Sequence, residues 1–120
     1  MAKPGRSGIA RIVAALGYSL QGLKAIWRME AAFRQEVAMS VVLIPLGFYL
    51  GEGGVEKTLL VCSCLLVMVV EVLNSAVEAV VDRVGHEKHE LSGVAKDLGS
   101  LAVLFSLIML TVTWVLILLF

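Results

Sequence analysis

The chain has 120 residues, of which 59% are hydrophobic and 17% are charged, and its 10 Lys and Arg residues balance its 10 Asp and Glu residues. Soluble domains are about 45–50% apolar, and disordered chains combine low hydrophobicity with high net charge, so this composition argues against both classes. The zero net charge argues against a nucleic-acid partner, and 120 residues with several membrane spans leave too little chain for a separate nucleotide-binding domain.

Residues 8–28 are predicted to form an amphipathic helix. Apolar side chains recur there at steps of three and four, at Ile9, Ile12, Val13, Leu16, Leu20, Leu23 and Trp27. On a helix they form one apolar stripe, and Arg11, Tyr18 and Lys24 lie off it. Because Arg11 interrupts the apolar run too early for a signal peptide, we expect a helix that lies on the membrane surface. A flexible basic tail is the alternative, and the regular spacing argues against it.

Three further helices are predicted, each containing one membrane span. They cover residues 29–50, 55–84 and 91–120. Their uncharged stretches are residues 37–50, 58–70 and 101–120. The last stretch alone is long enough to cross a hydrocarbon core of about 30 Å. We therefore predict an all-α integral membrane protein in which residues 1–120 form a single domain.

The basic residues predict the orientation of these spans. Nine of the ten fall on one side of the predicted membrane: Lys3, Arg6, Arg11, Lys24, Arg28, Arg34, Arg83, Lys88 and Lys96. Only Lys57, beside the Gly-rich turn at residues 51–54, falls on the other. By the positive-inside rule the larger group is cytoplasmic, which places the N-terminus inside and the C-terminus outside.

A polar face in the second half of the 55–84 helix is the strongest candidate site. Its members are Glu71, Asn74, Ser75, Glu78 and Asp82. If the span begins near Thr58, Glu71 lies about 10 Å short of the cytoplasmic interface, where partial desolvation suits a general base. Glu78 and Asp82 reach the interface, where carboxylates suit Mg²⁺. Interhelical hydrogen bonding or ion pairing is the alternative role for these acids.

Glu30 is a candidate partner for Glu78. It lies at the same depth if the two helices are antiparallel, and the two carboxylates would then share a metal ion. An ion pair with Arg34, one helical turn away, explains Glu30 equally well from spacing alone.

Four segments together resemble the prokaryotic diacylglycerol kinase family. They are EVLNSAVEAVVDR at 71–83, EAAFRQE at 30–36, GYS at 17–19 and HELSGVAKDLGS at 89–100. The resemblance implies a small integral-membrane kinase that transfers the γ-phosphate of MgATP to diacylglycerol and gives phosphatidate. It also implies a homotrimeric bundle with active sites shared between subunits, at the cytoplasmic face of the bacterial inner membrane.

The matching motifs also imply residue roles. Glu71 resembles the general base, and Glu30 and Glu78 resemble the acids that hold magnesium and ATP. Nucleotide-binding positions are matched by Arg11, Tyr18, Glu87, His89, Lys96 and Asp97. Lipid-binding positions are matched by Arg11, Ser19, Trp27, Phe33, Arg34, Gln35, Glu36, Glu71 and Ser100. The sequence departs from the usual family pattern at Leu20, Met29 and Lys88.

Three other functions compete with this reading. Phosphorylation of undecaprenol belongs to related kinases, and the 71–83 segment does not distinguish the two substrates, whereas the 30–36 and 89–100 segments favour diacylglycerol. A small proton-coupled transporter with Glu71 as its relay would fit better with an isolated acid and paired repeats. A structural membrane subunit would leave the clustered acids unexplained.

Overall fold

The computed structural model describes residues 7–120, and these residues form four α-helices and no strand. The helices are α1 (Gly8–Met29), α2 (Ala31–Leu50), α3 (Gly53–Val84) and α4 (Glu90–Leu119). The predicted all-α fold class is thereby confirmed. Lys3 and Arg6, which entered the orientation argument, lie outside the described residues.

Three of the helices are long and apolar enough to cross a membrane, namely α2, α3 and α4. The 20 residues of α2 give about 30 Å of helix. With 32 and 30 residues, α3 and α4 reach about 45–48 Å, which exceeds the hydrocarbon core of roughly 30 Å. The polar ends of both longer helices therefore extend past the apolar spans.

Helix α1 belongs to a separate compact unit, residues 1–31, and its apolar stripe is uncovered. The seven side chains of the stripe are between 48% and 80% exposed, from Trp27 to Ile9. A continuous apolar stripe on an amphipathic helix is the pattern of a segment that lies in a membrane surface. The surface location of α1 stays a prediction.

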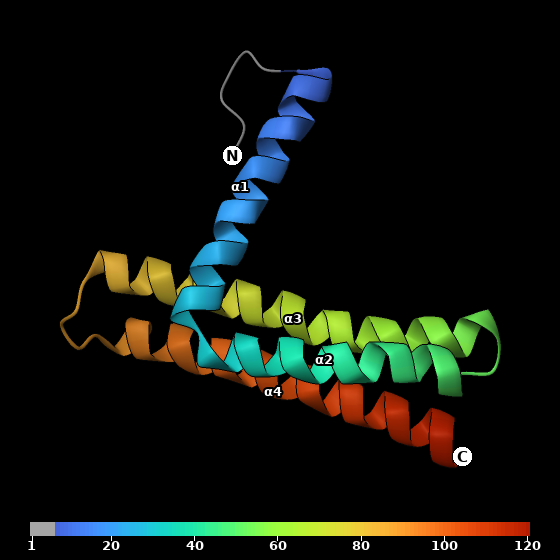
Figure 1. Cartoon of the computed structure of the whole chain (residues 1–120). Coiled ribbons are helices and arrows are strands. Elements are labelled where there is room, and N and C mark those ends of the chain that lie inside the picture. The colour runs from blue at the N-terminus through green and yellow to red at the C-terminus, as the bar shows by residue number, and fades with distance from the viewer. Residues whose placement is uncertain (1–6) are drawn as a thin grey trace. The chain divides into compact units, whose positions relative to one another are not determined.

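Helices α2, α3 and α4 pack side by side in the second unit, residues 32–120 (Figure 1). The centre of their core consists of Cys64, Val67 and Leu110. Partly buried side chains from α2 and α4 surround it: Met39, Leu43, Ile44, Leu107 and Trp114. In a lipid solvent such packing, rather than exclusion from water, brings helices together.

Glycines form the tight turn between α2 and α3. The backbone N–H of Gly51 donates to the carbonyl of Gly47 at 3.0 Å, and a Cβ on Gly51 would lie 2.9 Å from the backbone N of Lys57. Gly53 has a φ of 80°, in the region that favours glycine. The turn therefore depends on the composition of residues 51–54 and reverses the chain so that α2 and α3 run antiparallel.

Gly47 fixes how closely α2 approaches α3. A Cβ built on Gly47 would lie 3.1 Å from Leu60 Cβ and 3.7 Å from the Trp114 ring. Trp114 is held in turn, because its indole Nε1 donates to Ser63 Oγ at 3.0 Å. Ser63 Oγ donates to the carbonyl of Leu60 at 2.7 Å. Near the α2–α3 turn, the spacing of all three helices therefore depends on the small residue Gly47 and on the hydrogen bond from Trp114 to Ser63.

Replacing Gly47 with valine should separate α2 from α3. The added side chain meets Leu60, and overpacking of this kind costs about 1–3 kcal/mol. We expect Gly47→Val to unfold at a temperature several degrees below that of the wild type in detergent micelles. Gly54→Val is the matched control, because a Cβ there meets nothing within 4 Å. Equal unfolding temperatures for the two variants would contradict the close approach at Gly47.

Candidate active site

Glu71 is a buried carboxyl group in the apolar part of α3. Its side chain is only 5% exposed, and the carboxyl of Glu36 on α2 is one of its hydrogen-bond partners. The sequence had suggested a partly desolvated acid at this depth, and the burial agrees with that. This partner is not predicted by the sequence, in which Glu36 matches only a lipid-binding position. A pair of carboxyl groups, one buried and one half-buried, therefore joins α2 to α3.

The register of the α2–α3 hairpin explains why Glu36 meets Glu71. Glu36 lies 17 residues before Gly53, and Glu71 lies 17 residues after Gly54. Gly47 and Leu60, which also face each other, are likewise equidistant from the turn. Counting outward from the Gly-rich turn would have placed the two residues at the same level of the hairpin, but not on facing sides of the two helices.

Asn74 and Glu78 continue the polar face of α3 toward α4. Asn74 Nδ2 donates to Glu78 Oε1 at 3.4 Å. A Cβ on Gly99 of α4 would collide with Asn74 Oδ1, so a larger residue at position 99 would require the Asn74 side chain to move. Gly99 was not among the predicted site residues. An apolar groove of about 430 Å³ lies beside Asn74, and its other lining residues are Val70, Leu73, Val77, Ala95, Leu98, Gly99 and Ala102.

Four buried polar atoms in the described chain have no hydrogen-bond partner. They are Glu36 Oε2, Ser40 Oγ, Asn74 Oδ1 and Ser75 Oγ. All four belong to α2 or to the polar face of α3. Unpaired polar atoms are costly in an apolar environment, so the site retains unused capacity to bind a polar group.

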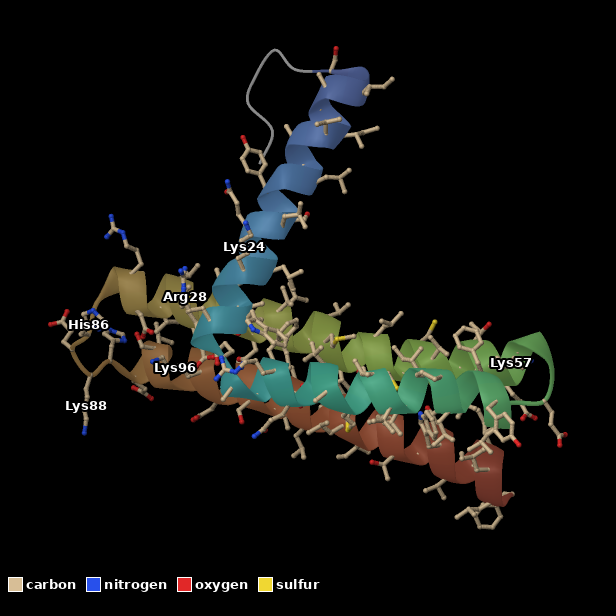
Figure 2. All side chains as sticks on the ribbon, viewed as in Figure 1. Lys24, Arg28, Lys57, His86, Lys88 and Lys96 are labelled. Carbon is tan, nitrogen blue, oxygen red and sulfur yellow. The ribbon has the colours of Figure 1, made fainter. Side chains whose placement is uncertain are left out.

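A second hollow of about 530 Å³ lies at the loop between α3 and α4. Its charged and titratable lining residues are Asp82, His86, Glu87, Lys88, His89, Glu90 and Lys96. Figure 2 shows that His86, Lys88 and Lys96 gather at this end of the three-helix unit, and that Lys57 lies at the opposite end. His89 also caps α4, because its Nδ1 accepts the backbone N–H of Leu91 at 3.1 Å.

An exposed ion pair closes one side of this loop hollow. Lys96 Nζ lies 2.9 Å from Asp82 Oδ1, beyond the apolar spans. The hydrogen bond from Lys96 and its positive charge hold the pKa of the Asp82 carboxyl below its usual value. For Asp82, therefore, the ion pairing that the sequence left open as an alternative is present. Exposed pairs of this kind are weak and exchange partners readily.

The predicted site residues as a whole fall into two units. Residues 1–31 contain Arg11, Tyr18, Ser19, Trp27 and Glu30. Residues 32–120 contain Phe33, Arg34, Gln35, Glu36, Glu71, Glu78, Glu87, His89, Lys96, Asp97 and Ser100. Within the second unit, the structure brings together Glu36 with Glu71, and Glu87 with His89 and Lys96.

The predicted metal site depends on how the carboxylates are grouped. Among residues 7–120, no group of three or more His, Cys, Asp or Glu side chains is placed to hold a metal ion. Mg²⁺ is usually held by one or two carboxylates together with substrate phosphates and water, because it dehydrates reluctantly. Glu78, a half-buried carboxyl at the end of α3, has the oxygen chemistry that such an ion prefers.

Comparisons with known proteins match nearly the whole chain. The family model described as prokaryotic diacylglycerol kinase matches residues 17–118. A protein of Pseudomonas aeruginosa named "Diacylglycerol kinase" is 53% identical over 115 residues, which cover 96% of this chain and 94% of the relative. Proteins of the same name from Escherichia coli K12 and Haemophilus influenzae are 51% and 50% identical over 108 residues. These matches cover 90% of this chain and 88% and 92% of the two relatives.

Proposed function

Because this chain belongs to the prokaryotic diacylglycerol kinase family and is a membrane lipid kinase, we propose that Glu71 is its general base in phosphate transfer from ATP to diacylglycerol. The observation that carries this proposal is the burial of Glu71 in an apolar helix, with 5% of its side chain exposed. Burying an ionisable side chain within a membrane span costs free energy, so acids in such positions usually have a function.

The proposed reaction is an in-line displacement at phosphorus. Glu71 accepts the proton as the lipid hydroxyl oxygen forms its bond to the γ-phosphorus, and the bond from that phosphorus to the β–γ bridging oxygen breaks. ADP leaves, and phosphatidate is the product. Phosphoryl transfer needs chiefly positioning and neutralisation of charge on oxygen, which a few side chains on helices can supply.

The loop hollow is the proposed entry for the nucleotide. Glu87, His89 and Lys96 line it. We assign Arg11, Tyr18 and Asp97 to the same ligand on the family motif alone. Lys96 would exchange Asp82 for a phosphate oxygen, which the weakness of an exposed ion pair permits. ATP brings Mg²⁺ with it, and Glu30 and Glu78 are the proposed protein ligands of that ion. A bound Mg²⁺ would neutralise charge on the phosphate oxygens.

The lipid is proposed to lie along the first turn of α2 and the neighbouring segments. Its positions are Arg11, Ser19, Trp27, Phe33, Arg34, Gln35, Glu36 and Ser100. We further propose that α1 lies on the cytoplasmic surface of the bacterial inner membrane, with the N-terminus inside, and that three chains assemble with shared active sites. The exposed apolar stripe of α1 supports the surface location, and the cluster of His86, Lys88 and Lys96 at one end of the spans supports the orientation.

The first test removes the base. Glu71→Gln retains size and hydrogen bonding but cannot accept the proton, so turnover should fall by about 10²–10⁴. The matched control is Glu52→Gln, which changes an exposed carboxylate at the opposite end of α3 and should keep full turnover. Turnover is measured by transfer of labelled γ-phosphate to diacylglycerol in mixed micelles. Near-normal turnover in Glu71→Gln would remove Glu71 from its role.

The second test concerns the metal. Glu30→Gln and Glu78→Gln should each raise the Mg²⁺ and ATP concentrations needed for half-maximal turnover, because each removes an anionic oxygen ligand. Titrations of both ligands against turnover measure the effect. The paired site is wrong if Glu30→Gln leaves the metal dependence untouched while Glu78→Gln abolishes it.

The third test asks whether subunits share a site. Glu30 and Glu71 lie in different units of the chain. Mixing inactive Glu30→Gln subunits with inactive Glu71→Gln subunits should restore part of the activity, in a ratio-dependent way, because some interfaces then receive one intact residue from each chain. Crosslinking establishes that mixed trimers have formed. If mixed trimers show no activity at any ratio, each site lies within one chain.

A further inference from the structure

The charges of this chain are divided unevenly along its length. Residues 1–29 contain five of the ten basic residues and none of the ten acidic residues. Within α1 the charged residues are Arg11, Lys24 and Arg28, all of them basic. A basic amphipathic helix is attracted to a negatively charged surface. The zero net charge of the whole chain therefore does not describe its first segment, which is strongly basic.

Two of these charges lie at the edge of the apolar stripe. With 3.6 residues per turn, Lys24 lies about 40° around the helix from Leu20, and Arg28 lies about 40° farther on. Both side chains are exposed, and Figure 2 shows them on α1. A lysine in such a position can lay its apolar stem along the stripe and keep its ammonium group in water. Arg28 has an interaction of its own within the described chain, so Lys24 is the residue that the test changes.

The chain itself holds this edge close to the membrane. Helix α1 ends at Met29, and α2, which is long and apolar enough to cross a membrane, begins at Ala31. Lys24 precedes Ala31 by seven residues, so about 10 Å of helix separates it from the start of the span. That distance is comparable with the screening length of about 8 Å at physiological ionic strength. Lys24 is therefore close enough to interact with charges at the membrane surface.

The partner of this edge has to offer both an apolar surface and negative charge at its border. The seven side chains of the stripe are 48–80% exposed and need an apolar cover. A bilayer of anionic phospholipid presents phosphate groups directly above apolar chains. A second copy of α1 would cover the stripe but bring like charges together. An acidic protein surface would supply the charge without the apolar cover.

We propose that the edge of α1 at Lys24 and Arg28 binds the phosphate groups of anionic phospholipids, so that these lipids gather around α1. The proposal rests on the surface location proposed for α1. The positively charged groups donate hydrogen bonds to phosphate oxygens, at the level where the apolar stripe enters the hydrocarbon. Diacylglycerol has no phosphate, whereas phosphatidate has one. The edge therefore binds lipids that carry the charge of the product and not the substrate.

Quenching of Trp27 by brominated lipid tests the proposal in the full-length chain. Trp27 is three residues from Lys24, so the two side chains are neighbours on the helix surface. The chain is reconstituted in vesicles of equal parts phosphatidylcholine and phosphatidylglycerol, with bromine on the acyl chains of one lipid or the other. A random distribution of the two lipids gives equal quenching. The chain has two tryptophans, and Trp27→Phe supplies the background signal of Trp114.

We expect stronger quenching of Trp27 when the bromine is on phosphatidylglycerol. This preference should fall by about two- to fivefold in Lys24→Gln, because each basic residue beside an anionic membrane contributes about a fivefold increase in affinity. Lys24→Arg keeps the charge and should keep the preference. Lys57→Gln is the matched control, because Lys57 lies at the opposite end of the spans from the loop hollow, and it should also keep the preference. In about 1 M NaCl, where the screening length is about 3 Å, the preference should disappear.

The outcomes separate this proposal from the surface location of α1. If neither lipid quenches Trp27, α1 does not lie on the membrane, and the surface location itself is wrong. Equal quenching by the two lipids keeps α1 at the surface and overturns the binding of anionic lipid. A preference that is unchanged in Lys24→Gln overturns the assignment to this edge. If brominated phosphatidate is preferred while phosphatidylglycerol is not, the edge is a product site, and the general recognition of anionic lipid is overturned.

Discussion

The high cost of an unpaired polar group in hydrocarbon governs the structure of this protein. Every backbone N–H and C=O within the bilayer needs a partner from the chain itself, and continuous helices are one of the two solutions. Polar side chains obey the same constraint. Within α4, Ser106 Oγ and Thr111 Oγ1 donate to carbonyls of the preceding turn, at 2.7 and 2.9 Å. Between helices, Trp114 is hydrogen-bonded to Ser63, and Glu36 is hydrogen-bonded to Glu71.

Because an unpaired polar group is costly in hydrocarbon, the buried polar atoms that have no hydrogen-bond partner are informative. The polar atoms that find no partner are concentrated on α2 and on the polar face of α3, where the catalytic acid is proposed to act. An enzyme that binds a lipid hydroxyl inside the span must keep such atoms available, at some cost to stability. The end of the spans where the nucleotide is proposed to bind is exposed to water, so charged groups there are less costly. Around Lys96 the charges are exposed and weakly paired, which suits a charged nucleotide that arrives from water and leaves again.

Much of the architecture could be predicted from residues because membrane helices are encoded locally. Predominantly apolar stretches with few charges identify α2, α3 and α4, and the period of apolar residues identifies α1. The predicted and observed helices begin and end within two residues of each other. The polar face from Glu71 to Asp82 follows from helical spacing in the same way. Each of these features depends on neighbours within a few turns.

What the sequence alone determined is therefore the number and type of the helices, the polar face of α3 that begins at Glu71 and the family to which the chain belongs. Only the tertiary structure decided which groups from different helices meet. Glu36 became the partner of Glu71, Lys96 became the partner of Asp82, and Gly99 left room for Asn74. The first contact depends on the register between α2 and α3, which the glycine turn and the close approach at Gly47 establish. The other two depend on the register between α3 and α4, which residues 85–89 connect. Spacing along one helix carries no information about that register, because helical periodicity describes a single face and not what lies opposite it.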